Sequence, residues 1–321
     1  MKNSDLEIKF GPKSTGDKGI AAKARFLQSW YRVNELKQKQ FGFGPEENSK
    51  TKYGNILVDG NKTGLNFLLP EIFEYAKYRI MFLKNGETIK EYRLFNNMLS
   101  SQPMCFNLFY PIKALFENND KAATKIVQAC FPNLDVKQLL TVEIEYLPYP
   151  VNVYLDDKTA FDAMLIYQNS NNEKNILAIE TKYIEKLGEN PSSKLDKQIE
   201  LVKNSNLFND KGKSAALKGF GQLGRNFLLA EKFRIENKLD KAFAVTVSPL
   251  ENDSSKSEIN EFHEYLNPEF KHQLFYTSLE DIVESIKKTV PKNLHKWIND
   301  FEKRYLDFKS IENIFKEYQK A

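Results

Sequence analysis

Three charged side chains interrupt two short apolar segments that otherwise have the composition of β-strands. Asp162 lies near the start of F-D-A-M-L-I-Y, and Glu180 and Lys182 lie in N-I-L-A-I-E-T-K-Y-I. An unpaired charge inside a packed strand is costly, so these side chains need a reason to be there. Two carboxylates and an ammonium group suit metal-assisted phosphodiester hydrolysis, which needs ligands for a cation, an activated water and charge stabilisation.

The loop between the two segments predicts how the three side chains are brought together. It reads Q-N-S-N-N-E-K and consists of turn-forming residues, which indicates a β-hairpin. If the loop centres on Asn171, residues equally far from it face each other, so Asp162 faces Glu180. Facing residues share a side of the sheet, and Lys182 returns to that side two residues later. A shift of one residue in the register would separate them.

Two carboxylates held this close repel each other and favour a cation between them. Magnesium typically takes one or two carboxylates and keeps several waters, so we expect Asp162 and Glu180 to bind Mg²⁺ or Mn²⁺. The alternative is that Glu180 and Lys182 form an ion pair on a solvated face of the sheet, where such pairs contribute little.

These residues resemble the site of the PD-(D/E)xK nuclease superfamily, in which an acidic residue on one strand precedes a (D/E)-x-K tripeptide on the next. Phe161 occupies the position of the proline. The tripeptide alone is uninformative, because it also occurs at Glu7 and Glu236. The chain is similar to a bacterial group within the superfamily over roughly residues 20 to 290. The segments that carry this similarity are Ser100-Ser101-Gln102, Phe106-Asn107-Leu108-Phe109, Phe161-Asp162-Ala163, Ile179–Tyr183 and Gln222–Leu229.

The resemblance implies a role for each of five residues. Asp162 and Glu180 would bind the metal ion, and Lys182 would position or activate the attacking water. Gln222 and Arg225 are three residues apart and share a helical face, from which they would assist with the phosphate or the water. We expect the head group of Lys182 to lie in the cleft, so that Lys182→Ala abolishes turnover and spares the fold.

Two glutamates in the strand before the hairpin are further candidates. The segment L-L-T-V-E-I-E-Y-L alternates from Val142 onward, which places Glu143 and Glu145 on one face. One of them would add a metal ligand or hold a water, and Glu145 fits the bacterial group better. The alternative is that this edge of the sheet faces solvent.

The order of predicted elements is that of an α/β protein. Helices precede the three strands described above, and a helical segment at 214–238 precedes a buried strand at 241–247. This order fits the restriction-endonuclease-like αβββαβ core with a central mixed sheet that the resemblance implies.

We expect three parts along the chain. Residues 1–95 form a helical and loop region packed on the core, with a loose arm at 1–16. Residues 96–290 form the nuclease-like domain. Residues 291–321 form a C-terminal helix whose apolar stripe packs on the core or on a second subunit, so a homodimer is possible.

The composition is ordinary for a soluble globular protein of 321 residues, with 41% hydrophobic and 28% charged residues. No apolar run is long enough to span a membrane, and the N-terminus lacks the apolar core of a signal peptide, so we expect a cytoplasmic protein. Cys105 and Cys130 lie in apolar surroundings and predict buried thiols. The three histidines are scattered, so no zinc site is expected. A net charge of +4 is too small to identify a nucleic-acid-binding protein by itself.

The sequence therefore predicts a metal-dependent nuclease acting on nucleic acid, with DNA favoured by the superfamily's tendency. The alternative is a catalytically idle module on the same fold that binds nucleic acid or a protein. A weaker alternative is a structural protein assembled through its aromatic C-terminal segment.

Overall fold

The computed structural model describes residues 3–320, which fall into two compact units. The first unit comprises the residues up to Leu83, Ile89–Leu108 and the residues from Pro291 onward. The second comprises Lys84–Thr88 and Phe109–Val290. The second unit contains the predicted hairpin and all five strands of the sheet.

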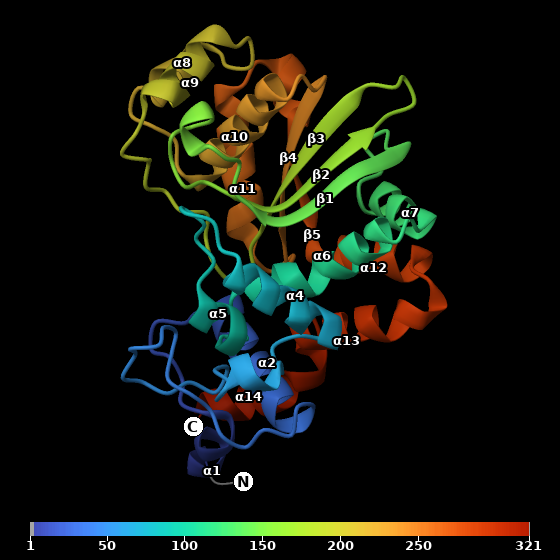
Figure 1. The fold of residues 1–321 in the computed structure, drawn as a ribbon. Helices are drawn as coiled ribbons and strands as arrows, with labels where there is room; N and C mark the ends of the chain where they lie inside the picture. Colours follow the sequence, from blue (N-terminus) through green and yellow to red (C-terminus); the bar gives the residue numbers. More distant parts are fainter. Residues whose placement is uncertain (1–2, 321) are drawn as a thin grey trace. The chain divides into compact units, whose positions relative to one another are not determined.

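A five-stranded mixed sheet forms the centre of the second unit (Figure 1). Its strands are adjacent in chain order: β1 (Gln138–Tyr146), β2 (Phe161–Gln168), β3 (Lys174–Thr181), β4 (Lys241–Ser248) and β5 (Leu274–Ser278). The first three pair antiparallel, whereas β4 is parallel to β3 and β5 is parallel to β4. β3 and β4 are buried along nearly their whole length, as expected of strands covered on both faces.

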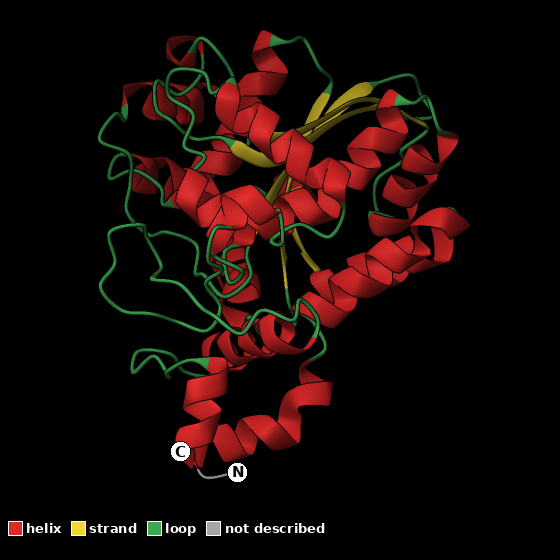
Figure 2. Cartoon of the chain, turned by 60° about the horizontal axis from the view of Figure 1, so that its bottom comes forward, coloured by secondary structure: helices red, strands yellow, loops and turns green. Residues whose placement is uncertain are grey.

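Helices cover both faces of this sheet (Figure 2). They are α7 (Lys121–Cys130), α10 (Gln222–Glu236), α11 (Asp253–Phe262) and α12 (Leu279–Thr289). Two further helices, α8 (Asp196–Asn204) and α9 (Asp210–Ala216), pack on each other, and α8 packs on α10. α10 packs on β3 and β4, and α7 packs on α12 at the opposite face (Figure 1). The order α7, β1 to β3, α10, β4 confirms the predicted αβββαβ core and the α/β fold class.

The first unit is helical. Its elements are α1 (Asn3–Phe10), α2 (Ile20–Asn34), α3 (Gly60–Thr63), α4 (Pro70–Met81), α5 (Glu91–Asn96), the start of α6 (Ser101–Glu117), α13 (His295–Tyr305) and α14 (Phe308–Lys320). Leu6 and Phe10 of α1 share a core with Phe26 of α2 and with Ile311 and Tyr318 of α14. The prediction of a loose arm at 1–16 was therefore wrong for α1, because distant parts of the chain supply its apolar partners.

Two predicted continuous helices are interrupted. The segment 214–238 breaks between α9 and α10, where Gly219 has a φ of +82°, a conformation that favours glycine. The C-terminal segment breaks between Tyr305 and Phe308. Both interruptions are short, so the apolar spacing on either side still resembled one helix.

Two smaller expectations, on the cysteines and on membrane spans, can also be compared with the structure. Asn107, from one of the segments that carry the resemblance, is buried in the first unit, where its side chain binds backbone groups of Asn66 and Leu68 and the hydroxyl of Tyr305. Cys105 and Cys130 are buried and form no disulfide, as predicted. Within residues 3–320, no helix has both the length and the apolar character needed to cross a bilayer.

Candidate active site

The hairpin of β2 and β3 has the predicted register. Ala163 pairs with Ile179 and Gln168 with Lys174, so residues equally far from Asn171 face each other. The loop is closed by Asn169, whose Oδ1 accepts hydrogen bonds from the backbone N–H groups of Asn171 and Glu173 at 3.0 and 2.9 Å. Local hydrogen bonding by an asparagine side chain thus fixes the turn and, with it, the register.

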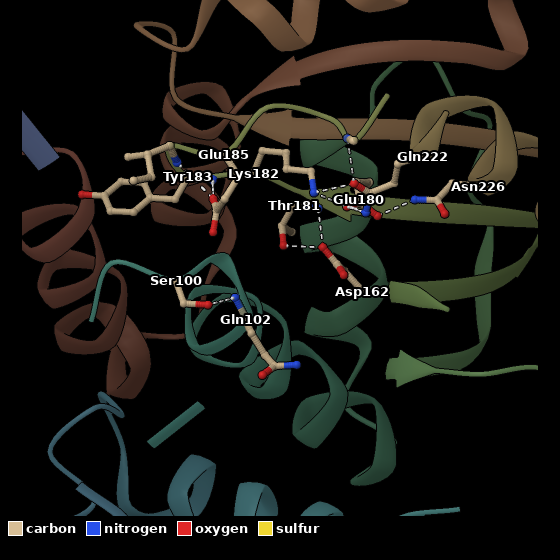
Figure 3. Close-up of polar contacts among 12 residues, drawn as sticks. Ser100, Gln102, Asp162, Glu180, Thr181, Lys182, Tyr183, Glu185, Gln222 and Asn226 are labelled. Carbon is tan, nitrogen blue, oxygen red and sulfur yellow. Dashed lines mark hydrogen bonds and ion pairs between the residues drawn. The ribbon is translucent and has the colours of Figure 1, made fainter. Parts of the chain in front are cut away.

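Asp162 is attached to the end of β3 through Thr181. Its Oδ2 accepts hydrogen bonds from the backbone N–H and from the hydroxyl of Thr181, each at 2.7 Å. The carboxylate is thereby held beside Glu180 and Lys182, which flank Thr181 in the chain (Figure 3). Thr181 is fully buried, and its role was not predicted from the sequence.

Glu180 and Lys182 form a buried ion pair. Lys182 Nζ lies 2.8 Å from Glu180 Oε1, and the two residues are only 7% and 5% exposed, respectively. A pair on a solvated face would be mostly exposed, so the structure excludes that alternative. The head group of Lys182 lies against Gln222 of α10, next to the residues that line the cleft, and its place in the cleft stays a prediction.

Gln222 links the two members of this pair. Its Nε2 donates to Glu180 Oε1 at 2.7 Å, and its Oε1 accepts a hydrogen bond from Lys182 Nζ at 3.0 Å (Figure 3). One turn further along α10, Asn226 Nδ2 donates to Glu180 Oε2. Residues four apart share one side of a helix, so α10 presents both amides to the same carboxylate.

A close backbone approach sets the position of Gln222. Its N–H donates to the carbonyl oxygen of Gly188 at 2.6 Å, and the N–H of Gly188 donates to Gln222 Oε1 at 3.2 Å. A Cβ atom on the preceding Gly221 would lie 2.6 Å from that same carbonyl oxygen. Glycine at 221 therefore allows the loop after β3 to lie against the N-terminus of α10.

Arg225 is bound to the same loop. Its Nη1 donates to the carbonyl oxygens of Asn190 and Phe220 at 2.6 and 3.4 Å. Arg225 also lines a cleft of about 440 Å³, together with Asp162, Gln222 and Asn226. It thus holds the cleft wall and presents a positive charge to the cleft.

The two glutamates of β1 have different surroundings. Glu143 lies 3.2 Å from Lys113 Nζ of α6. Glu145 is buried, lines the cleft with Asp162, and has a φ of +51°, which is uncommon for a residue with a side chain. Such strain often marks functional sites, and here it accompanies the placement of Glu145, rather than Glu143, beside Asp162.

The charges in this cluster shift two pKa values. Burial raises the pKa of the Asp162 carboxyl well above its ordinary value, and the negative charges of Glu180 and Glu145 raise it further. Burial acts to lower the pKa of Lys182, but the charges of Glu180 and Asp162 outweigh burial and raise it. Lys182 is therefore a protonated donor at neutral pH.

The cluster has the chemistry of a site for a hard cation. Its candidate ligands are carboxylate oxygens, and the repulsion that raises the pKa of Asp162 is what a bound cation would relieve. Among residues 3–320, no group of three or more His, Cys, Asp or Glu side chains forms a ready-made metal site. Asp162 and Glu180 with waters match the way in which Mg²⁺ is usually bound, and Glu145 is a third carboxylate nearby.

The structure thus brings together the candidates named from the sequence except Glu143, and it adds two residues. Asp162, Glu180, Lys182, Gln222 and Glu145 form one cluster, and Arg225 lies on the same cleft. Thr181 and Asn226 were missed. Asn226 follows Gln222 at helical spacing, which could have indicated a shared partner.

The comparisons with known proteins agree with this geometry. The family model described as the PD-(D/E)XK nuclease superfamily matches residues 15–307, which is most of the chain. No curated protein and no solved structure matches the chain significantly.

Proposed function

Since the chain belongs to the PD-(D/E)XK nuclease superfamily, whose members typically use divalent metal ions, we propose that it is a metal-dependent nuclease that hydrolyses phosphodiester bonds in DNA. One observation carries this proposal: the acidic residue of β2 and the Glu and Lys of β3 meet in one hydrogen-bonded cluster beside a cleft. DNA rather than RNA follows the superfamily's tendency.

Asp162 and Glu180 would hold Mg²⁺ or Mn²⁺, with Glu145 as a third carboxylate. When bound, the cation supplies a Lewis acid that lowers the pKa of the attacking water and offsets charge on the phosphate. The amides of Gln222 and Asn226 keep the Glu180 carboxylate in place from behind. Loss of a residue that supports a metal ligand in this way commonly lowers metal affinity or activity by about 10- to 100-fold.

Hydrolysis joins a water oxygen to phosphorus and breaks the bond to the leaving nucleotide oxygen, which takes up a proton. Lys182 is protonated, so it acts as a hydrogen-bond donor that orients the water or stabilises charge on the phosphate. Gln222 holds that ammonium group against Glu180. Arg225 contributes a second positive charge at the cleft, where its guanidinium can bind a phosphate oxygen.

The test is a cleavage panel of linear and circular duplex DNA, single-stranded DNA and RNA, each with Mg²⁺, Mn²⁺ or EDTA. Lys182→Gln is assayed beside Lys174→Gln, which changes an exposed lysine at the other end of β3. We expect metal-dependent cleavage that Lys182→Gln abolishes and Lys174→Gln retains. Sedimentation with and without DNA would show whether cleavage of both strands involves a homodimer.

One negative result would redirect the search for the substrate, and another would count against the proposal. If the chain binds Mn²⁺ but cleaves no substrate in the panel, the target is narrower than those tested or a partner is required. If it neither cleaves nor binds metal, the chain is an idle binding module on the same fold.

A further inference from the structure

The first unit contains a pocket of about 690 Å³ that the catalytic cluster does not use. Phe43, Tyr92 and Val58 supply apolar surface, and Lys39, Lys52 and Asn61 supply polar groups. Phe43 and Val58 are 42% and 43% exposed. A pocket lined by half-exposed apolar side chains together with a few polar and charged groups is typical of ligand sites.

Backbone hydrogen bonds build the wall that carries Phe43. Phe43 pairs with Lys52 as an antiparallel bridge, and the N–H groups of Gly42 and Gly44 donate to the carbonyl oxygens of Ile56 and Thr51. A Cβ atom on Gly44 would lie 2.5 Å from side-chain atoms of Ile56. Glycine at positions 42 and 44 therefore allows the backbone on each side of Phe43 to lie against the buried side chain of Ile56.

Two further side chains hold the pocket in shape. Arg32 is fully buried and donates from Nη1 to the carbonyl oxygens of Gln38 and Gln40, at 2.6 and 3.0 Å, which fixes the approach to the wall. The hydroxyl of Tyr92 donates to the carbonyl oxygen of Phe43 at 2.5 Å. The aromatic surface is therefore preorganised.

The charges around the pocket suit a ligand with a flat ring and an anionic group. Lys52 Nζ lies 5.0 Å from the centre of the Phe43 ring. Neither Lys39 nor Lys52 makes an ion pair with any residue in the described range.

Glu47 and Asp59 also line the pocket, and Asp59 lies 3.3 Å from Lys62. A carboxylate can accept a hydrogen bond from the amino group of a base, and the amide of Asn61 can donate or accept.

We propose that this pocket binds one nucleotide, with its base against Phe43 and its phosphate at Lys52 and Lys39. The proposal rests on the proposed function, because nucleic acid is then the ligand that the chain meets. Stacking on an aromatic side chain with a cation nearby is the usual way in which proteins bind unpaired bases. The nucleotide is either an unpaired position of the substrate strand or a free mononucleotide.

The test measures binding by the full chain in EDTA, so it does not depend on turnover. Fluorescence anisotropy is followed with labelled single-stranded DNA and RNA 12-mers, and calorimetry with AMP, CMP, GMP and UMP. Phe43→Ala and Lys52→Gln are compared with Phe82→Ala and Lys309→Gln, which change an exposed aromatic residue and an exposed lysine elsewhere in the first unit.

We expect Phe43→Ala to weaken binding about fivefold or more, and Lys52→Gln to weaken it and reduce its salt dependence. The two control variants should bind as the unmodified chain does. Weakened binding of the 12-mers alone assigns the pocket to the strand, and weakened binding of mononucleotides alone assigns it to a free nucleotide. Photocrosslinking of a bromouridine-containing 12-mer to the unmodified chain should label the peptide that contains Phe43, whether or not the variants fold.

Unchanged affinities of both variants for every probe, with crosslinks mapping elsewhere, would overturn the proposal. That result would leave metal-dependent cleavage by the second unit intact. Conversely, loss of the proposed nuclease activity would leave a positive binding result standing.

Discussion

Lys182 Nζ lies 2.8 Å from Glu180 Oε1, in an ion pair from which solvent is almost completely excluded. Breaking such a pair on one side leaves the other charge buried, which typically costs about 3–5 kcal/mol. Here the amides of Gln222 and Asn226 remain on Glu180, so the lower end of that range applies.

The first prediction concerns Lys182→Gln. We expect cleavage to fall by a factor of about 100 or more, because a positioned donor is lost at the reacting centre. We also expect the metal-free protein to lose about 3 kcal/mol of stability. Cleavage rates and thermal melting measure the two effects, with Lys174→Gln as the control. Normal turnover by Lys182→Gln would remove this residue from the mechanism.

The second prediction concerns Asp162→Asn. The carboxylate is partly buried beside Glu180 and Glu145, so its charge destabilises the metal-free protein, whereas an asparagine oxygen can still accept the hydrogen bonds of Thr181. We expect this variant to be more stable without metal, by about 1 kcal/mol, and to lose cleavage.

Melting with and without Mn²⁺ tests the same variant further. A ligand at 100 times its Kd stabilises the unmodified protein by about 2.7 kcal/mol, and Asp162→Asn should lose most of that gain. A full Mn²⁺-induced shift in the variant would show that Asp162 is not a ligand.

The third prediction separates the two glutamates of β1. Glu145 lines the cleft with Asp162, whereas Glu143 lies beside Lys113. We expect Glu145→Gln to lower cleavage or metal affinity about 10-fold or more, and Glu143→Gln to leave both unchanged. Cleavage titrated with Mg²⁺ gives both quantities. Equal effects of the two substitutions would rule out a particular role for Glu145.

Local sequence determines the half of the site that lies on the hairpin. The turn residues around Asn171 fix the register, and the register brings Asp162 to the end of β3. Period-two alternation then places Glu180 and Lys182 together. These relationships span few residues, so the sequence was sufficient to predict them.

The half of the site on α10 could not be predicted in the same way. Gln222 comes forty positions after Lys182 in the chain, and the segment between them includes α8, α9 and an irregular loop. The depth to which α10 covers the ion pair depends on the contact between Gly188 and Gln222, which is a tertiary feature. For the same reason the burial of Lys182 was missed, as was the helix at Asn3–Phe10, whose partners lie on α14.

The fourth prediction tests Asn226. Its side chain donates from Nδ2 to Glu180 Oε2, and its Oδ1 has no hydrogen-bond partner among residues 3–320, so the contact with Glu180 is what this amide provides. Asn226→Asp preserves the shape, removes the donor and places a second negative charge against Glu180. We expect the cleavage rate to fall about 10- to 100-fold, with little change in substrate KM. The affinity for Mn²⁺, measured through the stabilisation that Mn²⁺ causes, should fall by a similar factor. Thr246→Val, which alters a neighbouring buried polar group opposite Glu180 in the β3–β4 pairing, is the matched control and should retain activity. If Asn226→Asp cleaves normally and keeps its Mn²⁺ response, the orientation of Glu180 depends on Gln222 and Lys182 alone.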